Sequence, residues 1–326
     1  MRRARVGIAV GLLLALTACA APLPEPQPDA IPAVLPPALS VEQVEEVLAD
    51  VAATLAEADT AGSAELLEPR VEGAAERIRT VEYVLAAAGD PDALTPIPAN
   101  AQTLVVPTTD TWPRTVMVVT EPPEDLQAPL LLVLVQAEPR AQYELQAWAR
   151  LFPGVQTPPT TQPEIGSRAV DPDDETLLVS PETVVAEYLD VLTNGAESEF
   201  AAAFTEDPLR AGIAATRAAF TESASVNGGS LTETYQPAGL GPYAIATADG
   251  GAIVVGVIET LTTITLADSV LTLGDQTAAL LGKDTVTTSV AFTWLSVVAF
   301  AVPPAGSSQP IEVLGAEHSR VGATGE

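Results

Sequence analysis

The chain has 326 residues and a formal net charge of −29 at pH 7, because 43 acidic side chains face only 14 basic ones. Such a charge repels phosphate backbones, so we expect no nucleic acid as a partner. The sequence has one cysteine and one histidine, which excludes an intramolecular disulfide and a zinc or iron centre built from several such ligands.

The first 18 residues have the pattern of a bacterial signal peptide. "MRRARV" is a short cationic segment, and "GIAVGLLLALTA" is an apolar run. This run has about 12 residues, and a membrane-spanning helix needs about 20. We therefore expect a cleaved export signal over residues 1–18.

The signal segment ends in Leu16-Thr17-Ala18-Cys19, which resembles the bacterial lipobox. The resemblance implies that the Cys19 thiol is acylated, that cleavage precedes it, and that the acyl chains hold the protein in the lipid bilayer. The expected location is the outer face of the bacterial cytoplasmic membrane. Cleavage removes three arginines, so the net charge changes from −29 to −32. This negative charge repels anionic lipid head groups and keeps the folded part of the protein away from the bilayer surface.

Residues 19–39 contain Cys19 and then a proline-rich stalk, with seven prolines between residues 22 and 37. Such density favours polyproline II, with a reach of up to about 60 Å. The alternative is a proline-rich ligand for a recognition domain. The position directly after the lipobox favours a spacer between bilayer and domain.

A first folded unit is predicted over residues 40–155. Ser40 and Gln43 form a capping box, and apolar residues at three- and four-residue spacing predict a helix over 41–59. A second helix follows Pro69 and ends at Gly89. Extended runs at 114–120, 129–136 and 143–152 predict three strands.

A linker over residues 156–179 separates this unit from a second one, over 180–326. Ser180-Pro181 begins a helix that Gly195 ends, and another helix starts near Pro208. Extended runs follow at 252–266, 286–302 and 310–318. The run 286–302 raises the alternative of a membrane span, but its β-branched content favours a buried strand.

The predicted fold class is α+β, with two similar units that each pack helices on an antiparallel sheet. This element order resembles the NTF2-like and cystatin-like folds. "RVEGAAERIRTVEYVLAAAG" and "TWPRTVMVVT" resemble a family of actinobacterial lipoproteins of unknown function. That resemblance implies no activity that could be transferred to this chain.

Few residues in the sequence indicate catalysis. His318 is the only base open to a Ser-His-Asp arrangement, and we interpret it as part of a solvated tail or as a structural residue. No GxSxG, HExxH or phosphate-binding glycine loop occurs. "DPDDE" at 171–175 lacks the spacing of an EF-hand and is interpreted as a solvated charge run. We assign no catalytic residue, metal or cofactor, and paired carboxylates stay open.

The few aromatic residues are expected in the core, with a ligand pocket as the alternative. For that pocket we select Arg77, Arg114 and Tyr143. Two functions then stand. The first is a non-catalytic module that binds an envelope protein or a small ligand; the second is an enzyme with an acid- or tyrosine-based pocket on an NTF2-like scaffold.

The lipobox gives the first testable prediction. Cys19→Ser removes the thiol that would carry the lipid, so we expect an uncleaved precursor without acyl groups. Mass spectrometry of the mature N-terminus and membrane fractionation of both proteins measure this. A wild-type N-terminus at Ala20 without acyl groups would contradict the prediction.

Overall fold

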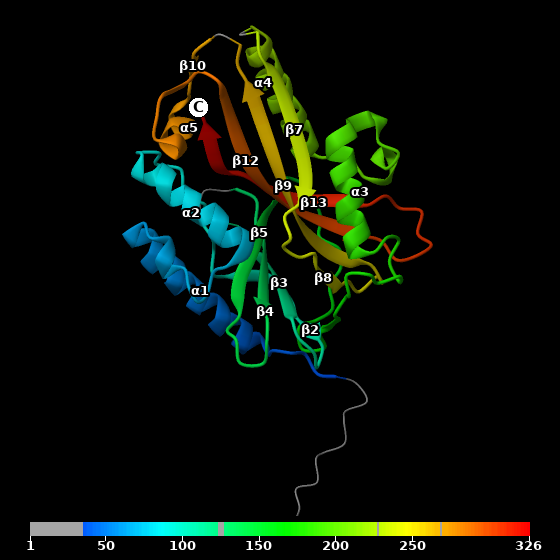
Figure 1. Ribbon diagram of the computed structural model, residues 1–326. Helices are drawn as coiled ribbons and strands as arrows, with labels where there is room; N and C mark the ends of the chain where they lie inside the picture. The colour runs from blue at the N-terminus through cyan, green and yellow to red at the C-terminus, as the bar shows by residue number, and fades with distance from the viewer. Residues whose placement is uncertain (1–34, 123–126, 227, 268) are drawn as a thin grey trace, which may run out of the picture. The chain divides into compact units, whose positions relative to one another are not determined.

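The centre of the computed structural model is a nine-stranded antiparallel sheet with the strand order β1-β3-β4-β5-β13-β12-β9-β7, to which β8 adds by pairing with β9 (Figure 1). The structure describes residues 35–122, 127–226, 228–267 and 269–326. Leu35–Glu326 forms one compact unit. The predicted signal peptide, Cys19 and residues 19–34 of the predicted stalk lie outside the described residues.

The helices of the first half confirm the capping box. Helix α1 (Val41–Ala61) starts at Ser40, whose side chain accepts from the Gln43 N–H while the Gln43 side chain accepts from Ser40. Helix α2 (Gly73–Ala87) follows a short 3-10 turn, η1 (Ala64–Leu66). The sequence predicts that this helix starts directly after Pro69. It starts at Gly73 instead, because Val71 forms a β-bridge with Leu145 and is therefore extended.

The strands of the first half are short and lie in sequence order across the sheet. The three predicted strands are present as β3 (Arg114–Thr120), β4 (Leu130–Gln136) and β5 (Glu144–Leu151). Strand β1 (Ala101–Val105), which is not among the predicted strands, adds an edge to the sheet. Two short strands, β2 (Pro107–Thr108) and β6 (Ser167–Arg168), pair with each other outside the main sheet.

The second half also begins with two long helices. Helix α3 (Pro181–Asn194) is capped by Ser180 and ends at Gly195, as predicted. Short 3-10 turns, η2 (Gly195–Glu197) and η3 (Ala201–Ala203), precede α4 (Pro208–Val226). In the part of the chain that the structure describes, none of the helices has both the length and the apolar character needed to cross a membrane.

The strands of the second half are longer. They are β7 (Ser230–Pro237), β8 (Tyr243–Ala246), β9 (Ala252–Thr265), β12 (Ser289–Val302) and β13 (Glu312–Gly325). The apolar run 286–302 is thus largely the buried strand β12, as predicted. Between β9 and β12 lie β10 (Leu271–Thr272), α5 (Asp275–Leu281) and β11 (Thr285–Val286).

The two halves meet where their last strands pair. Strand β5 pairs with β13 at only two positions, Leu151 with Gly315 and Arg150 with Ala316. A side chain at Gly315 would meet the Arg150 carbonyl oxygen at 2.3 Å, so this junction requires glycine. The α+β class with antiparallel pairing is confirmed. That residues 40–155 and 180–326 are separate units stays a prediction, and one apolar core contains Val118 of the first half and Val257 of the second.

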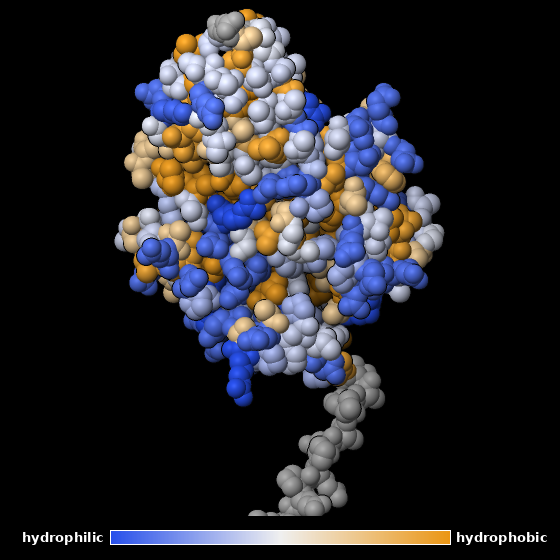
Figure 2. Space-filling model, in the orientation of Figure 1, coloured by the Kyte–Doolittle hydropathy of each residue, from blue (hydrophilic) through white to orange (hydrophobic). Residues whose placement is uncertain are grey.

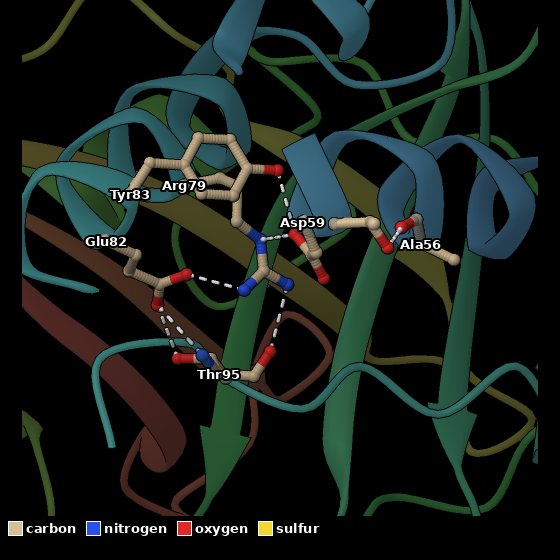
Figure 3. Close-up of polar contacts among 7 residues, drawn as sticks. Ala56, Asp59, Arg79, Glu82, Tyr83 and Thr95 are labelled. Atoms are coloured by element: carbon tan, nitrogen blue, oxygen red, sulfur yellow. Dashed lines mark hydrogen bonds and ion pairs between the residues drawn. The ribbon is translucent and has the colours of Figure 1, made fainter. Parts of the chain in front are cut away.

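A buried ion cluster joins α1 to α2 and to the loop after α2 (Figure 3). The Arg79 side chain is 1% exposed; its guanidinium donates to Glu82 at 2.7 Å and to the Thr95 carbonyl oxygen at 2.9 Å. Asp59 of α1 lies 3.6 Å from Arg79 and accepts from the Tyr83 hydroxyl at 2.8 Å. Burial raises the pKa of Glu82, and the charge of Arg79 opposes this rise.

The second prediction concerns this cluster. Arg79→Met leaves the Glu82 carboxylate buried without its cation, and removing one partner of a buried pair costs about 3–5 kcal/mol. The matched control is Arg168→Met, because Arg168 is 49% exposed where it pairs with Asp174, and such surface pairs contribute about 0–1 kcal/mol. Urea unfolding of both variants measures the difference. Equal losses of stability would contradict the prediction.

Candidate functional site

A band of polar side chains crosses one face of the second-half sheet. Side chains alternate between faces along a strand, and the pairing register sets Trp294 of β12 beside Thr260 of β9 and Arg320 of β13. The same register sets Ser296 beside His318. We define the polar band as the residues of this face between its two apolar clusters: Glu233, Tyr235, Thr260, Thr262, Trp294, Ser296 and His318.

Apolar packing encloses the band on two sides. On one side Val254, Val298 and Phe300 pack against α3, whose Tyr188 lies edge-on to Phe300 at 5.1 Å. On the other side a smaller cluster contains Phe292, which stacks on Phe220 of α4. Helices α3 and α4 both contact β7 and β9. The polar groups are therefore held in largely apolar surroundings.

His318 is fixed inside the band and is not part of a solvated tail. Its Nδ1 lies 2.8 Å from the Ser296 hydroxyl, and its ring stacks on Trp294 with centroids 4.9 Å apart. Burial lowers the pKa of His318 to about 4; Arg320 also lowers it, and Glu233 opposes them. The imidazole is thus neutral at pH 7, and of the two readings of the sequence only the structural residue remains.

Glu233 is the centre of the charged part of the band. Its Oε2 accepts from Arg217 Nε of α4 at 2.5 Å and from the Tyr235 hydroxyl at 3.0 Å, and its Oε1 accepts from Thr262 at 3.0 Å. Arg217 also donates to the Tyr235 hydroxyl at 2.6 Å and to the Leu192 carbonyl oxygen of α3 at 2.8 Å. Burial raises the pKa of Tyr235 to about 12, so this phenol stays protonated.

A small cavity lies against the band. Its volume is about 10 Å³, room for about one water molecule. Its lining includes Ile213, Glu233, Tyr235, Thr260, Trp294 and His318. The Thr260 hydroxyl is buried and has no hydrogen-bond partner. A buried hydroxyl without a partner is costly, so the cavity offers an unused hydrogen-bonding group.

A larger cleft of about 370 Å³ is lined by α3, α4 and the turns between them. Its walls include Leu192, Asp207, Arg210, Ile213 and Arg217. Ile213 lines both the cleft and the small cavity, and Arg217 extends from the cleft to Glu233 and Tyr235 of the cavity. Cleft and cavity are thus neighbours with Arg217 between them.

The geometry does not favour nucleophilic catalysis at this site. Ser296 and His318 are at the distance of a nucleophile and its base, but Ser296 is 0% exposed, so its hydroxyl cannot reach a substrate carbonyl. Both carboxylate oxygens of Glu233 already accept hydrogen bonds, from Arg217, Tyr235 and Thr262, so neither oxygen is free to contact a substrate.

None of the three residues selected from the sequence lines the cleft or the small cavity described above. Arg77 of α2 donates to Glu259 of β9 at 2.6 Å, on the face opposite the polar band. Arg114 lies over the Trp112 ring at 4.0 Å, and Tyr143 is 5% exposed with its hydroxyl unpaired. Burial raises the pKa of Tyr143, which Arg114 partly offsets. Their role in ligand binding stays a prediction.

A pair of carboxyl groups lies elsewhere, where α2 begins beside β5. Burial, together with a hydrogen bond to the neighbouring Glu72 carboxyl, raises the pKa of Glu144 to about 7. The Gln146 amide donates to both groups, at 3.0 and 3.3 Å. Neither glutamate lines the cleft or the small cavity described above, so the pair does not extend that site.

The acidic run 171–175 makes contacts within the chain. Asp174 pairs with Arg168 and accepts from the Thr176 N–H at 2.8 Å. Among residues 35–122, 127–226, 228–267 and 269–326, no three His, Cys, Asp or Glu side chains form a group that could hold a metal ion.

Sequence reasoning missed most of the polar band, although one signal was present. The strand "SVAFTWLSVVAFAV" interrupts an apolar run with Trp294 and Ser296 two residues apart, which places both on one face. Residues Glu233 and Tyr235 of β7 have the same spacing. Which face each pair occupies, and which pairs meet, depends on the register between strands.

The fold and this site define an α+β domain in which two helices cover a polar band on an antiparallel sheet. A family model described as a domain of unknown function (DUF8094) matches residues 35–325. Because this match spans most of the chain, the protein belongs to that family. No curated protein and no solved structure matches the chain.

The third prediction is the titration of His318, which can be followed without assignment because it is the only histidine. We expect the imidazole proton resonances to titrate with a midpoint near 4, against an ordinary value of 6.5. Since the pKa is lowered on folding, this group's contribution to stability is complete above pH 6.5 and is lost as the pH falls toward 4. His318→Asn should lack this part of the pH dependence of urea unfolding. A midpoint at or above 6.5 would show that the imidazole is not buried as described.

Proposed function

We propose that the protein is a lipid-anchored extracytoplasmic binding module, which takes a small polar ligand into the cleft between α3 and α4 and against the polar band. The anchor rests on the lipobox around Cys19 and on the proline-rich residues 19–39, which give the domain reach from the outer face of the cytoplasmic membrane. The likeness to actinobacterial lipoproteins supports the same location.

One observation carries the binding proposal. The cavity beside the cleft offers the unpartnered Thr260 hydroxyl and the neutral imidazole of His318 within apolar surroundings. Binding sites for small molecules have this character, with a few fixed polar groups in an otherwise apolar recess. A polar group of a ligand that enters the cavity would give the Thr260 hydroxyl a hydrogen-bond partner.

A small ligand fits the surface better than a protein partner does. In the part of the chain that the structure describes, the large apolar side chains that are well exposed are few and come from separate segments: Leu66, Val84, Ile165, Val226, Leu261 and Val270. On the face shown in Figure 2, apolar surface is broken up by hydrophilic residues. Protein interfaces present a continuous apolar patch instead. An envelope protein remains the alternative partner, and a pull-down with the anchored protein tests it.

An enzyme with an acid- or tyrosine-based pocket is the second candidate, because Glu233 and Tyr235 line the cavity. Both oxygens of Glu233 already accept hydrogen bonds from Arg217, Tyr235 and Thr262, and burial keeps the Tyr235 phenol protonated. Neither side chain therefore offers a free group for proton exchange with a substrate near pH 7. These contacts favour binding over turnover.

The fourth prediction is that the protein isolated from its own membranes carries a small molecule in the cleft. Ala214 is an exposed residue of α4 that lines the cleft, so Ala214→Trp fills this space without disturbing the core. Native mass spectrometry should show a non-covalent adduct on the wild type and a loss of at least about tenfold in its occupancy in the variant.

Ala215→Trp is the matched control, because Ala215 is the next residue of α4, is also exposed and does not line the cleft. This variant should keep the adduct. An adduct that survives Ala214→Trp would place binding elsewhere, and a wild type without any adduct would count against the binding proposal.

A further inference from the structure

We propose that the ligand is an organic cation, such as an amine or a guanidine, and that Arg217 occupies the cation's place on Glu233 until the ligand displaces it. This inference rests on the proposed function, since it names the chemical class that the cleft and the polar band would bind. It follows from the contacts of Glu233, from the position of Arg217, and from the aromatic rings around them.

Glu233 needs a positive charge beside it. Its side chain is 11% exposed, and Arg217 is the cation paired with it. Two neutral donors, Tyr235 and Thr262, would stay on the carboxylate if the guanidinium left. A buried carboxylate without a cation is strongly unfavourable. Any ligand that displaces Arg217 therefore has to bring a positive charge, and an anionic ligand would meet an unpaired acid.

Arg217 is placed so that it can leave. Its side chain is 33% exposed and lines the cleft, while Glu233 lies beneath it in the small cavity. Its third contact is the Leu192 carbonyl oxygen at the end of α3, which water can replace on the cleft side. Rotation of Arg217 into the cleft would join the 10 Å³ cavity to the 370 Å³ cleft, and the joined space admits a small organic cation.

The walls of the cavity also suit a cation. Tyr235 and Trp294 line it together with Glu233, and the Arg217 guanidinium carbon is 5.6 Å from the Tyr235 ring centroid. Aromatic faces attract ammonium and guanidinium groups, most strongly where water is excluded. The neutral His318 ring, stacked on Trp294, adds no positive charge. The Arg320 guanidinium already lies over the Trp294 ring at 4.7 Å, so Tyr235 is the aromatic partner left for the ligand's cation. The excess of acidic residues over the whole chain raises the local concentration of cations.

The test uses the full-length protein and three small probes of similar size: methylguanidinium, its neutral analogue methylurea, and acetate. Arg217→Ala removes the guanidinium group that pairs with the Glu233 carboxylate. This variant should therefore bind methylguanidinium at least about tenfold more tightly than the wild type does. Binding is followed by the imidazole resonances of His318 and by calorimetry. In the double variant with Glu233→Gln, this gain should disappear. Methylurea and acetate should not bind more tightly to any variant.

Arg168→Ala is the matched control. Arg168 also pairs with a largely buried carboxylate, Asp174, whose side chain is 8% exposed, and neither residue lines the cavity or the cleft. This variant should gain no affinity for methylguanidinium at the His318 probe. If Arg217→Ala does not fold, as judged by circular dichroism, Arg217→Lys replaces it. Lysine keeps the positive charge but cannot form the paired hydrogen bonds of a guanidinium group. The affinity of Arg217→Lys for methylguanidinium should therefore lie between that of the wild type and that expected for Arg217→Ala.

The outcomes separate this inference from the proposed function. Methylguanidinium binding that increases in Arg217→Ala and needs Glu233 supports the inference. If methylurea or acetate binds more tightly than methylguanidinium, the proposal that the ligand is a cation is wrong, but the proposal of a ligand site still stands. If none of the probes perturbs His318 in a folded Arg217→Ala variant, the cation inference fails; the adduct experiment with Ala214→Trp then decides the proposed function by itself.

Discussion

The pairing of β12 with β9 and β13 is the constraint on which the second half of the fold and its site depend. Fourteen consecutive residue pairs join β12 to β9, from Ser289–Thr265 to Val302–Ala252, without a shift in register. A slip by one residue would turn every side chain to the other face. Trp294 and Ser296 would then leave the polar band, and Phe300 would leave the core under α3.

The polar band is stable only because its neighbours satisfy most of its groups. Glu233 has a cation and two hydroxyl donors, and Ser296 has His318. Thr260 departs from this pattern, since its buried hydroxyl has no partner. Fold stability alone would favour an apolar residue at such a place. Functional sites often contain a local conflict of this kind, and this hydroxyl lies at the cavity beside the cleft.

Much of the fold could be predicted because it follows from local signals. The capping box at Ser40 and the helix start at Ser180 predicted helices close to those observed. The apolar run Arg114–Thr120 predicted a strand with the observed bounds. Edges were less predictable, since β1 and β7 present weaker patterns than the buried strands. The start of α2 was misplaced because a contact with Leu145, far along the chain, holds Val71 extended.

The sequence by itself determined the elements, the acidic charge and the scarcity of nucleophile–base pairs, because these depend on residue type and short-range spacing. The tertiary structure alone decided the site. Arg217, Glu233 and His318 come from α4, β7 and β13. Only strand register brings Glu233 and His318 to one cavity, and only helix packing places Arg217 beside it. Burial then sets their chemistry: it makes the single histidine neutral and gives one arginine a buried acid as its partner.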